Sequence, residues 1–344
     1  MIRRPPRSTQ GVSSAASDVY KRQALAGSLA AFSANAAEMS VSGSAKISYV
    51  NTDSSEVTGN PYGMNTSLGF SGSGDVNGYD VSMLVTAADQ FAGMSSASVT
   101  VDLGDMGKVS FDQGVGIGGI STIDDKTPSA YEEVWDGLDA VTGDKNGLVG
   151  GGNSGVFVYS NDIMGSAFTA QYGKGGSSAQ TDDASSGTTG SSGSSWDFAV
   201  TNSSLYEGMT VGGGYGKIAN AGGGQGSDDD EHYTAFVTYT ASGVTVGYQE
   251  SFVGNDQQGG MDEEAQAWGV SVNLMEGLSA SYGEREVEHV KASSANVTED
   301  TDGFAVAYTM GSAKVTVQNN ETSNNGGTAG VSDETFQVAL SLSF

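Results

Sequence analysis

The chain has 344 residues, a formal net charge of −27 and no cysteine. Disulfides and thiolate metal sites are therefore excluded, and an acidic surface that repels phosphate argues against nucleic-acid binding. A chain of this length commonly forms two or more domains, although barrels often run longer as one unit.

The first 37 residues differ from the rest of the chain. Residues 1–23, MIRRPPRSTQGVSSAASDVYKRQ, resemble translated adapter sequence left by gene assembly, and we expect them to be non-native; a genuine basic leader is the alternative. Residues 24–37, ALAGSLAAFSANAA, combine a short apolar run with Ala34-Asn35-Ala36, a small-x-small cleavage site. This pattern predicts a truncated secretory signal peptide, with the mature chain starting at Ala37 or Glu38 and leaving the cytoplasm.

The remaining residues, 38–344, alternate between apolar and polar positions in short segments. In TFQVALSLSF, residues 335–344, every second side chain from Phe336 is apolar, which is the period of a β-strand. The connections between these segments are alternately a tight turn and a long polar loop. In the first of the tight turns, Asn77-Gly78 is a strong hairpin signal. The pattern predicts strands at 38–50, 64–74, 78–87, 97–103, 108–113, 155–161, 166–173, 196–202, 209–217, 232–241, 244–252, 265–274, 278–286, 303–309, 314–320 and 335–344.

An even number of strands with alternating short and long connections is typical of an outer-membrane β-barrel. In such a barrel lipid solvates the outward apolar face and water fills the polar interior. We therefore predict an all-β fold, a 16-stranded antiparallel transmembrane barrel. The last strand is expected to pair with the first at Met39–Tyr49, because closure removes both open edges.

At this level the chain resembles the Gram-negative general porins, of the 16-strand trimeric type found in alphaproteobacteria. The resemblance rests on EMSVSGSAKISYV at the start, LGFSGSGDVNGYDVSM, DLGDMGKVSF before a long loop, and the aromatic terminus. It implies a homotrimer in outer-membrane lipid and lipopolysaccharide that lets ions and small hydrophilic solutes diffuse passively. It also implies that the outer-membrane assembly machinery reads Phe344 as its signal.

In that family the third long loop folds into the barrel and narrows the channel. Residues 114–153 stand in the corresponding place, and SAYEEVWDGLDAV at 129–141 resembles the acidic loop core. The resemblance implies a constriction whose loop acids are Asp124, Asp125, Glu132, Glu133, Asp136 and Asp139, with Asp144 further along.

Basic side chains on the barrel wall are expected opposite this loop. Strand parity places Lys46, Arg285 and Lys314 on the inward face. Bases facing carboxylates across water create a transverse field, and the carboxylate excess predicts a preference for cations. Asn65 and Thr66 stand where the family often has further bases, which makes the constriction less basic.

Several alternatives remain open from the sequence. The three bases could be solvated lumen charges, and the loop acids could be surface-exposed. The acidic runs 228–231 and 262–264 could bind Ca²⁺, although no cofactor is otherwise expected. A Gly/Ser-rich secreted adhesin or surface structural protein is a second function. A barrel enzyme is a third, which the lack of a nucleophile-base pair beside His232 or His289 disfavours.

Overall fold

The computed structural model describes residues 38–52, 60–88, 93–138, 154–174, 194–219, 229–254, 261–291 and 294–344. The adapter-like stretch and the signal peptide lie outside these residues and stay predictions. Among the described residues, no helix is long and apolar enough to cross a membrane. The first eight strands are β1 (Glu38–Thr52), β2 (Tyr62–Val76), β3 (Tyr79–Ala88), β4 (Gly93–Asp102), β5 (Lys108–Gln113), β6 (Ser154–Ile163), β7 (Ser166–Gly173) and β8 (Ser195–Asn202).

The second half of the chain supplies eight further strands, and short 3₁₀ turns lie between some of the strands. The strands are β9 (Met209–Ile218), β10 (Asp230–Ala241), β11 (Val244–Val253), β12 (Met261–Met275), β13 (Leu278–Lys291), β14 (Val297–Met310), β15 (Ala313–Ser323) and β16 (Ser332–Ser343). The 3₁₀ turns are η2 (Gly104–Met106), η3 (Ile120–Ile123) and η4 (Asn325–Gly327).

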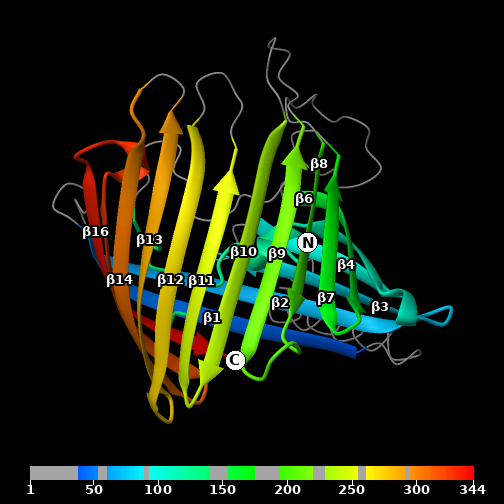
Figure 1. Cartoon of the computed structure of the whole chain (residues 1–344). Helices are drawn as coiled ribbons and strands as arrows, with labels where there is room; N and C mark the ends of the chain where they lie inside the picture. The colour runs from blue at the N-terminus through cyan, green and yellow to red at the C-terminus, as the bar shows by residue number, and fades with distance from the viewer. Residues whose placement is uncertain are drawn as a thin grey trace, which may run out of the picture.

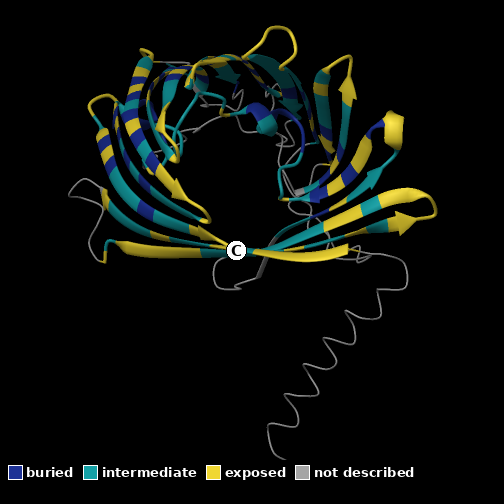
Figure 2. Cartoon of the chain, turned by 90° about the horizontal axis from the view of Figure 1, so that it is seen from below, coloured by how far each residue is buried: buried dark blue, intermediate teal, exposed yellow. Residues whose placement is uncertain are grey.

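Each strand pairs with its neighbours in sequence, and β16 pairs with β1 to close the barrel (Figures 1 and 2). The closing register sets Lys46 opposite Ser341 and Tyr49 opposite Val338. Beyond the last paired residues, the Gly43 amide donates to the Phe344 carbonyl at 2.8 Å, and the Phe344 amide donates to the Gly43 carbonyl at 2.9 Å. The predictions of 16 antiparallel strands and of a terminal strand that closes the barrel are confirmed.

Tight turns connect alternate strands at the lower end of the barrel in Figure 1. In the turn between β2 and β3, Asn77 and Gly78 have φ of 56° and 87°, as a two-residue type I′ hairpin requires at both positions. The observed strands run further than the alternation predicts; β14, for example, covers Val297–Met310 rather than 303–309. The ladder continues into polar residues there, because backbone hydrogen bonds do not need an apolar face.

The two faces of the barrel are the reverse of those in a water-soluble sandwich. On β14 the large side chains of Phe304 and Tyr308 are 46% and 39% exposed, whereas the polar side chains of Gln318 and Asn320 on β15 are 3% and 1% exposed. The apolar residues therefore cover the outside of the barrel. The polar residues point to the opposite side, toward the interior of the barrel.

Candidate functional site

The described part of the long connection after β5, residues 114–138, is called the third loop below. Its first turn is fixed by Asp112, whose carboxylate accepts the amides of Val115, Gly116 and Ile117 at 2.8–2.9 Å. The turn η3 follows, and Ile120 and Ile123 pack there in an apolar cluster with Ala199 and Phe236. The start of the loop is therefore built into the wall by both hydrogen bonds and apolar packing.

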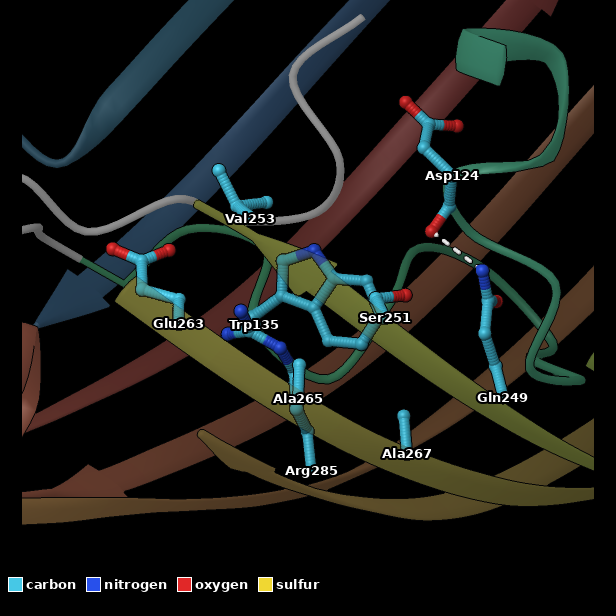
Figure 3. Close-up of a pocket in the computed structure, with 9 residues that line it drawn as sticks. All are labelled: Asp124, Trp135, Gln249, Ser251, Val253, Glu263, Ala265, Ala267 and Arg285. Atoms are coloured by element: carbon cyan, nitrogen blue, oxygen red, sulfur yellow. Dashed lines mark hydrogen bonds between the residues drawn. The ribbon is translucent and has the colours of Figure 1, made fainter. Parts of the chain in front are cut away.

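Wall side chains hold the loop further along by its main chain. The Gln249 amide of β11 donates to the carbonyls of Ile123 and Asp124 at 2.9 and 3.0 Å, and its oxygen accepts the Lys126 amide at 2.6 Å (Figure 3). Gln318 on β15 donates to the Glu133 carbonyl at 2.8 Å. These contacts use backbone atoms of the loop rather than its carboxylates.

Tyr131 and two wall lysines form a contact between the loop and the closing strands. Lys46 Nζ donates to the Tyr131 hydroxyl at 3.2 Å, and Lys314 Nζ lies 5.3 Å from the centroid of the same ring. Lys46 and Lys314 both pair with Ser341 of β16 in the strand register, so they occupy one row of the wall. The structure thus brings two of the three predicted bases together beside the loop acids.

The loop carboxyls are drawn toward the neutral form. Burial raises the pKa of Asp124 to about 7, and the charge of Asp125 and a hydrogen bond to it add to this. Burial also raises the pKa of Glu133 to about 7, helped by a hydrogen bond to Asp125. The pKa values of Glu132 and Asp136 are likewise raised by burial, although Lys46 opposes both shifts. The charge of the loop therefore responds to pH near neutrality.

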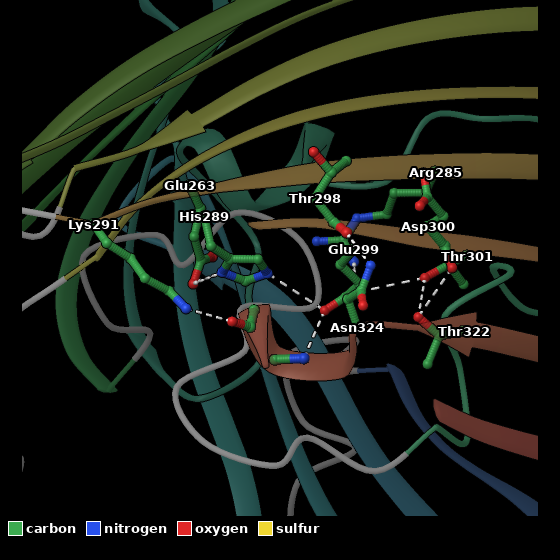
Figure 4. A network of polar contacts seen from close by, with 12 residues as sticks. Glu263, Arg285, His289, Lys291, Thr298, Glu299, Asp300, Thr301, Thr322 and Asn324 are labelled. Carbon is green, nitrogen blue, oxygen red and sulfur yellow. Dashed lines mark hydrogen bonds and ion pairs between the residues drawn. The ribbon is translucent and has the colours of Figure 1, made fainter. Parts of the chain in front are cut away.

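Arg285 lines a pocket together with Asp124 and Trp135, but its charged partner lies on the wall. Its guanidinium is 4.9 Å from the Trp135 ring centroid and 3.5 Å from Glu299 Oε1, and its side chain is only 3% exposed (Figures 3 and 4). The other Glu299 oxygen accepts the Gly326 amide of η4 at 2.8 Å and lies 3.4 Å from His289 Nε2. Arg285 therefore joins the third loop to the loop between β15 and β16 rather than facing the loop acids across water.

The remaining candidates are the acidic runs considered for Ca²⁺ binding and the two histidines considered for an enzyme. Lys217 pairs with Glu231 at 2.8 Å, within the acidic run whose Asp228 lies outside the described residues. In the described part of the chain, no group of three or more acids and histidines has the arrangement of a metal site. Ca²⁺ binding stays a prediction. Both histidines considered for an enzyme are buried, with His232 1% and His289 0% exposed.

No family model matches the chain, and no curated protein matches it. Solved structures do. The Salmonella typhi OmpF complex with daunomycin matches with TM-score 0.63 and 12% identity over 89% of this chain and 97% of that one. The outer membrane channel DcaP of Acinetobacter baumannii matches with TM-score 0.60 and 12% identity, over 90% of this chain and 97% of that one. The trimer form of Vibrio cholerae OmpT, an outer membrane protein, matches with TM-score 0.63 and 12% identity, over 90% of this chain and 100% of that one. The chain has the porin fold.

Within this porin fold the predicted site residues divide into three groups. Lys46 and Lys314 lie beside the described loop acids Glu132 and Asp136. The side chains of Asp124, Asp125 and Glu133 form a second cluster of carboxyl groups, further from Lys46 and Lys314. Arg285 lines a pocket with Asp124 and Trp135 and is paired with Glu299, and Asp139 lies outside the described residues. Phe344 directly follows the closing strand β16 and is 79% exposed.

Sequence reasoning missed the residues that seat the loop. The inward glycines Gly247, Gly269 and Gly283 are paired across β11, β12 and β13 and form a bare row on the wall. A Cβ atom at Gly269 would lie 2.8 Å from the Pro128 carbonyl oxygen, and one at Gly283 would lie 3.1 Å from a Val134 methyl. Glycine at the same lumen-facing register of successive strands was the available signal.

Replacing Gly269 by Val tests the role of this row. The added side chain meets loop backbone, so we expect the loop to move away from the wall and the single-channel conductance to fall. The control is Gly72→Val on the lipid side, where a Cβ atom would find its first neighbour, the Glu38 carbonyl oxygen, at 3.9 Å. A Gly269→Val protein that folds and conducts like the parent would show that the row does not position the loop.

Proposed function

We propose that this chain is an outer-membrane porin of a Gram-negative bacterium, a passive channel for ions and small hydrophilic solutes with a preference for cations. The observation that carries the proposal is a closed 16-strand barrel that is apolar outside and polar inside. A closed barrel leaves no unpaired strand edge, which is the requirement for strands that cross lipid. The closed barrel also excludes the solenoid form of the adhesin alternative, and we infer no enzymatic activity.

We further propose that the third loop folds into the lumen and forms the constriction. Support comes from hydrogen bonds between the loop and inward side chains on distant strands, including Gln249 on β11, Gln318 on β15 and Lys46 on β1. A surface loop could not reach these three strands at once. Figure 2, a view along the barrel, is consistent with this, because buried and half-buried segments are seen inside the ring of strands.

Cation preference follows from the charges at this constriction. The proposed eyelet has the acids Asp124, Asp125, Glu132, Glu133, Asp136 and Asp139 on the loop, against Lys46 and Lys314 on the wall. Arg285 is proposed to anchor the loop rather than to face the channel, because it is paired with Glu299. Rings of carboxylates favour cations in a water-filled pore.

Partners and processing belong to the same proposal. We infer a homotrimer of the alphaproteobacterial type in lipid and lipopolysaccharide, reached after removal of the signal peptide at 24–37. The trimer form of the similar Vibrio cholerae protein supports the oligomer. Phe344, whose backbone closes onto Gly43, would be the signal for the assembly machinery.

Planar-bilayer recording in a KCl gradient tests the function. We expect discrete conductance steps and a reversal potential on the cation side, because the loop presents more carboxylates than the facing wall presents ammonium groups. A reversal potential on the anion side would contradict the cation preference. A protein that stays soluble without detergent and forms no channels would contradict the whole proposal and favour a secreted protein.

A further inference from the structure

Lys46 and Lys314 do not pair with the acids that lie nearest to them. Among the described residues, no carboxylate oxygen lies within the 4.0 Å ion-pair distance of either Nζ atom. Yet Glu132 adjoins Tyr131 in the loop, and the charges of both lysines act to lower its pKa. The charge of Lys46 acts in the same direction on the pKa of Asp136. Long lysine side chains beside carboxylates would ordinarily close into ion pairs, so something holds these charges apart.

Tyr131 is the group between them. Lys46 Nζ lies 3.2 Å from the Tyr131 hydroxyl and 5.7 Å from the ring centroid. These two distances place the ammonium beyond the hydroxyl, near the C–O axis, rather than over the ring. Lys314 Nζ is 5.3 Å from the centroid and is within cation–π range. One tyrosine therefore engages both ammonium groups by different interactions.

The wall and loop fix the position of this ring. Lys46 and Lys314 lie on the two strands that flank β16 in the same row, so their Cα atoms are roughly 10 Å apart, two strand spacings. On the loop side, the Ala130 amide donates to Ser281 Oγ at 2.9 Å, and the Tyr131 amide donates to Ser129 Oγ at 3.2 Å. Tyr131 is thus held on a pinned stretch of backbone opposite two anchored lysines.

We propose that Tyr131 is a specificity-determining residue that keeps the ammonium groups of Lys46 and Lys314 separated from the carboxylates of Glu132 and Asp136. This inference rests on the proposed channel function. Separation preserves two charged poles, which a solute carrying both an ammonium and a carboxylate group can meet at once. If the lysines closed onto the acids, the net charge would be unchanged, but both poles would be lost. The readout is therefore the passage of zwitterions relative to neutral solutes, rather than ion selectivity alone.

The energetic balance makes the device sensitive to a single substitution. A hydrogen bond or cation–π contact to an ammonium and an exposed ion pair are of similar strength. Removing the tyrosine therefore shifts both lysines toward Glu132 and Asp136. Removing only its hydroxyl shifts Lys46 and leaves Lys314 on the ring.

Swelling of proteoliposomes that hold the full-length trimer or monomer tests the proposal, with γ-aminobutyric acid and a neutral amide of equal size as probes. We expect Tyr131→Ala to lower the ratio of zwitterion to amide rates about two- to fivefold, and Tyr131→Phe to lower it less. Tyr172→Ala, at an exposed tyrosine on the lipid side of β7, is the control and should leave the ratio unchanged.

Other outcomes would overturn the proposal. If Tyr131 only narrows the channel, Tyr131→Ala raises both rates equally and Tyr131→Phe changes neither. If Tyr131→Ala does not fold, an unchanged ratio in the folded Tyr131→Phe protein is sufficient to reject the role of the hydroxyl and with it the proposal. A parent protein that admits neither probe would instead contradict the channel function itself, so the two failures are distinguishable.

Discussion

Deleting Asp124–Asp139 and bridging the gap with a short Gly-Ser linker should raise the single-channel conductance by an amount on the order of twofold. The deletion keeps η3, whose Ile120 and Ile123 are packed into the wall, and removes the stretch held by Gln249 and Gln318. Current through a narrow pore is limited by its narrowest section, so removal of that section has a large effect. The measurement is a conductance histogram from planar bilayers.

A full-length variant separates loss of the loop from loss of folding. Changing both Gln249 and Gln318 to Ala removes two of the side-chain amides that hold the loop backbone and leaves the Asn320 amide, which donates to the Asp136 carbonyl, and it should make the current noisier without deleting any residue. Gln266→Ala, an exposed position on β12, is the matched control. Each protein is first shown to be folded by its altered migration on a detergent gel before boiling. A folded deletion protein with the parent conductance would show that the loop is not the constriction.

Lowering the pH from 8 to 6 should move the reversal potential in a KCl gradient toward zero. Asp124 and Glu133 have pKa values raised to about 7. They are therefore about nine-tenths ionised at pH 8 and about one-tenth ionised at pH 6, so the constriction loses negative charge. The folded loop also binds these protons more tightly than the unfolded chain, so its stability falls as the pH rises from the ordinary carboxyl values to about 7.

Two variants identify the groups responsible for the pH response. Asp124→Asn with Glu133→Gln should give a cation selectivity at pH 8 that is close to the parent value at pH 6, and it should flatten the pH response. Asp105→Asn, in the exposed tight turn at the other end of the barrel, should leave the response intact. A parent channel whose reversal potential is the same at both pH values would contradict these raised pKa values.

The barrel could be predicted from the sequence because its signals are local. Alternation within each strand and the pairs Asn77-Gly78 and Ser242-Gly243 act over a few residues, and together they fix strand number, direction and closure. Strand ends were less predictable. The ladder of β12, for example, continues past the apolar band to Met261, because pairing there depends on the neighbouring strand rather than on side-chain polarity.

The site was harder to predict because its contacts join residues far apart in the chain. Parity placed Lys46, Lys314 and Arg285 on the inward face, and in the structure all three side chains contact aromatic residues of the third loop. Parity says nothing about depth or cover, so it could not show that Trp135 and Glu299 enclose Arg285. The role of Tyr131 was equally hidden, since its partners lie on strands at opposite ends of the sequence.

The glycine row on β11, β12 and β13 means that two separate segments of the chain determine the shape and position of the loop. One segment is the loop itself, and the other is the wall, where Gly247, Gly269 and Gly283 leave the space that the loop residues occupy. An inserted side chain on either side would spoil the fit, so changes in one segment constrain changes in the other. In a set of related barrels, a bulkier Pro128 or Val134 position should be accompanied by glycine at the facing wall position, and a shortened loop should release those glycines to vary.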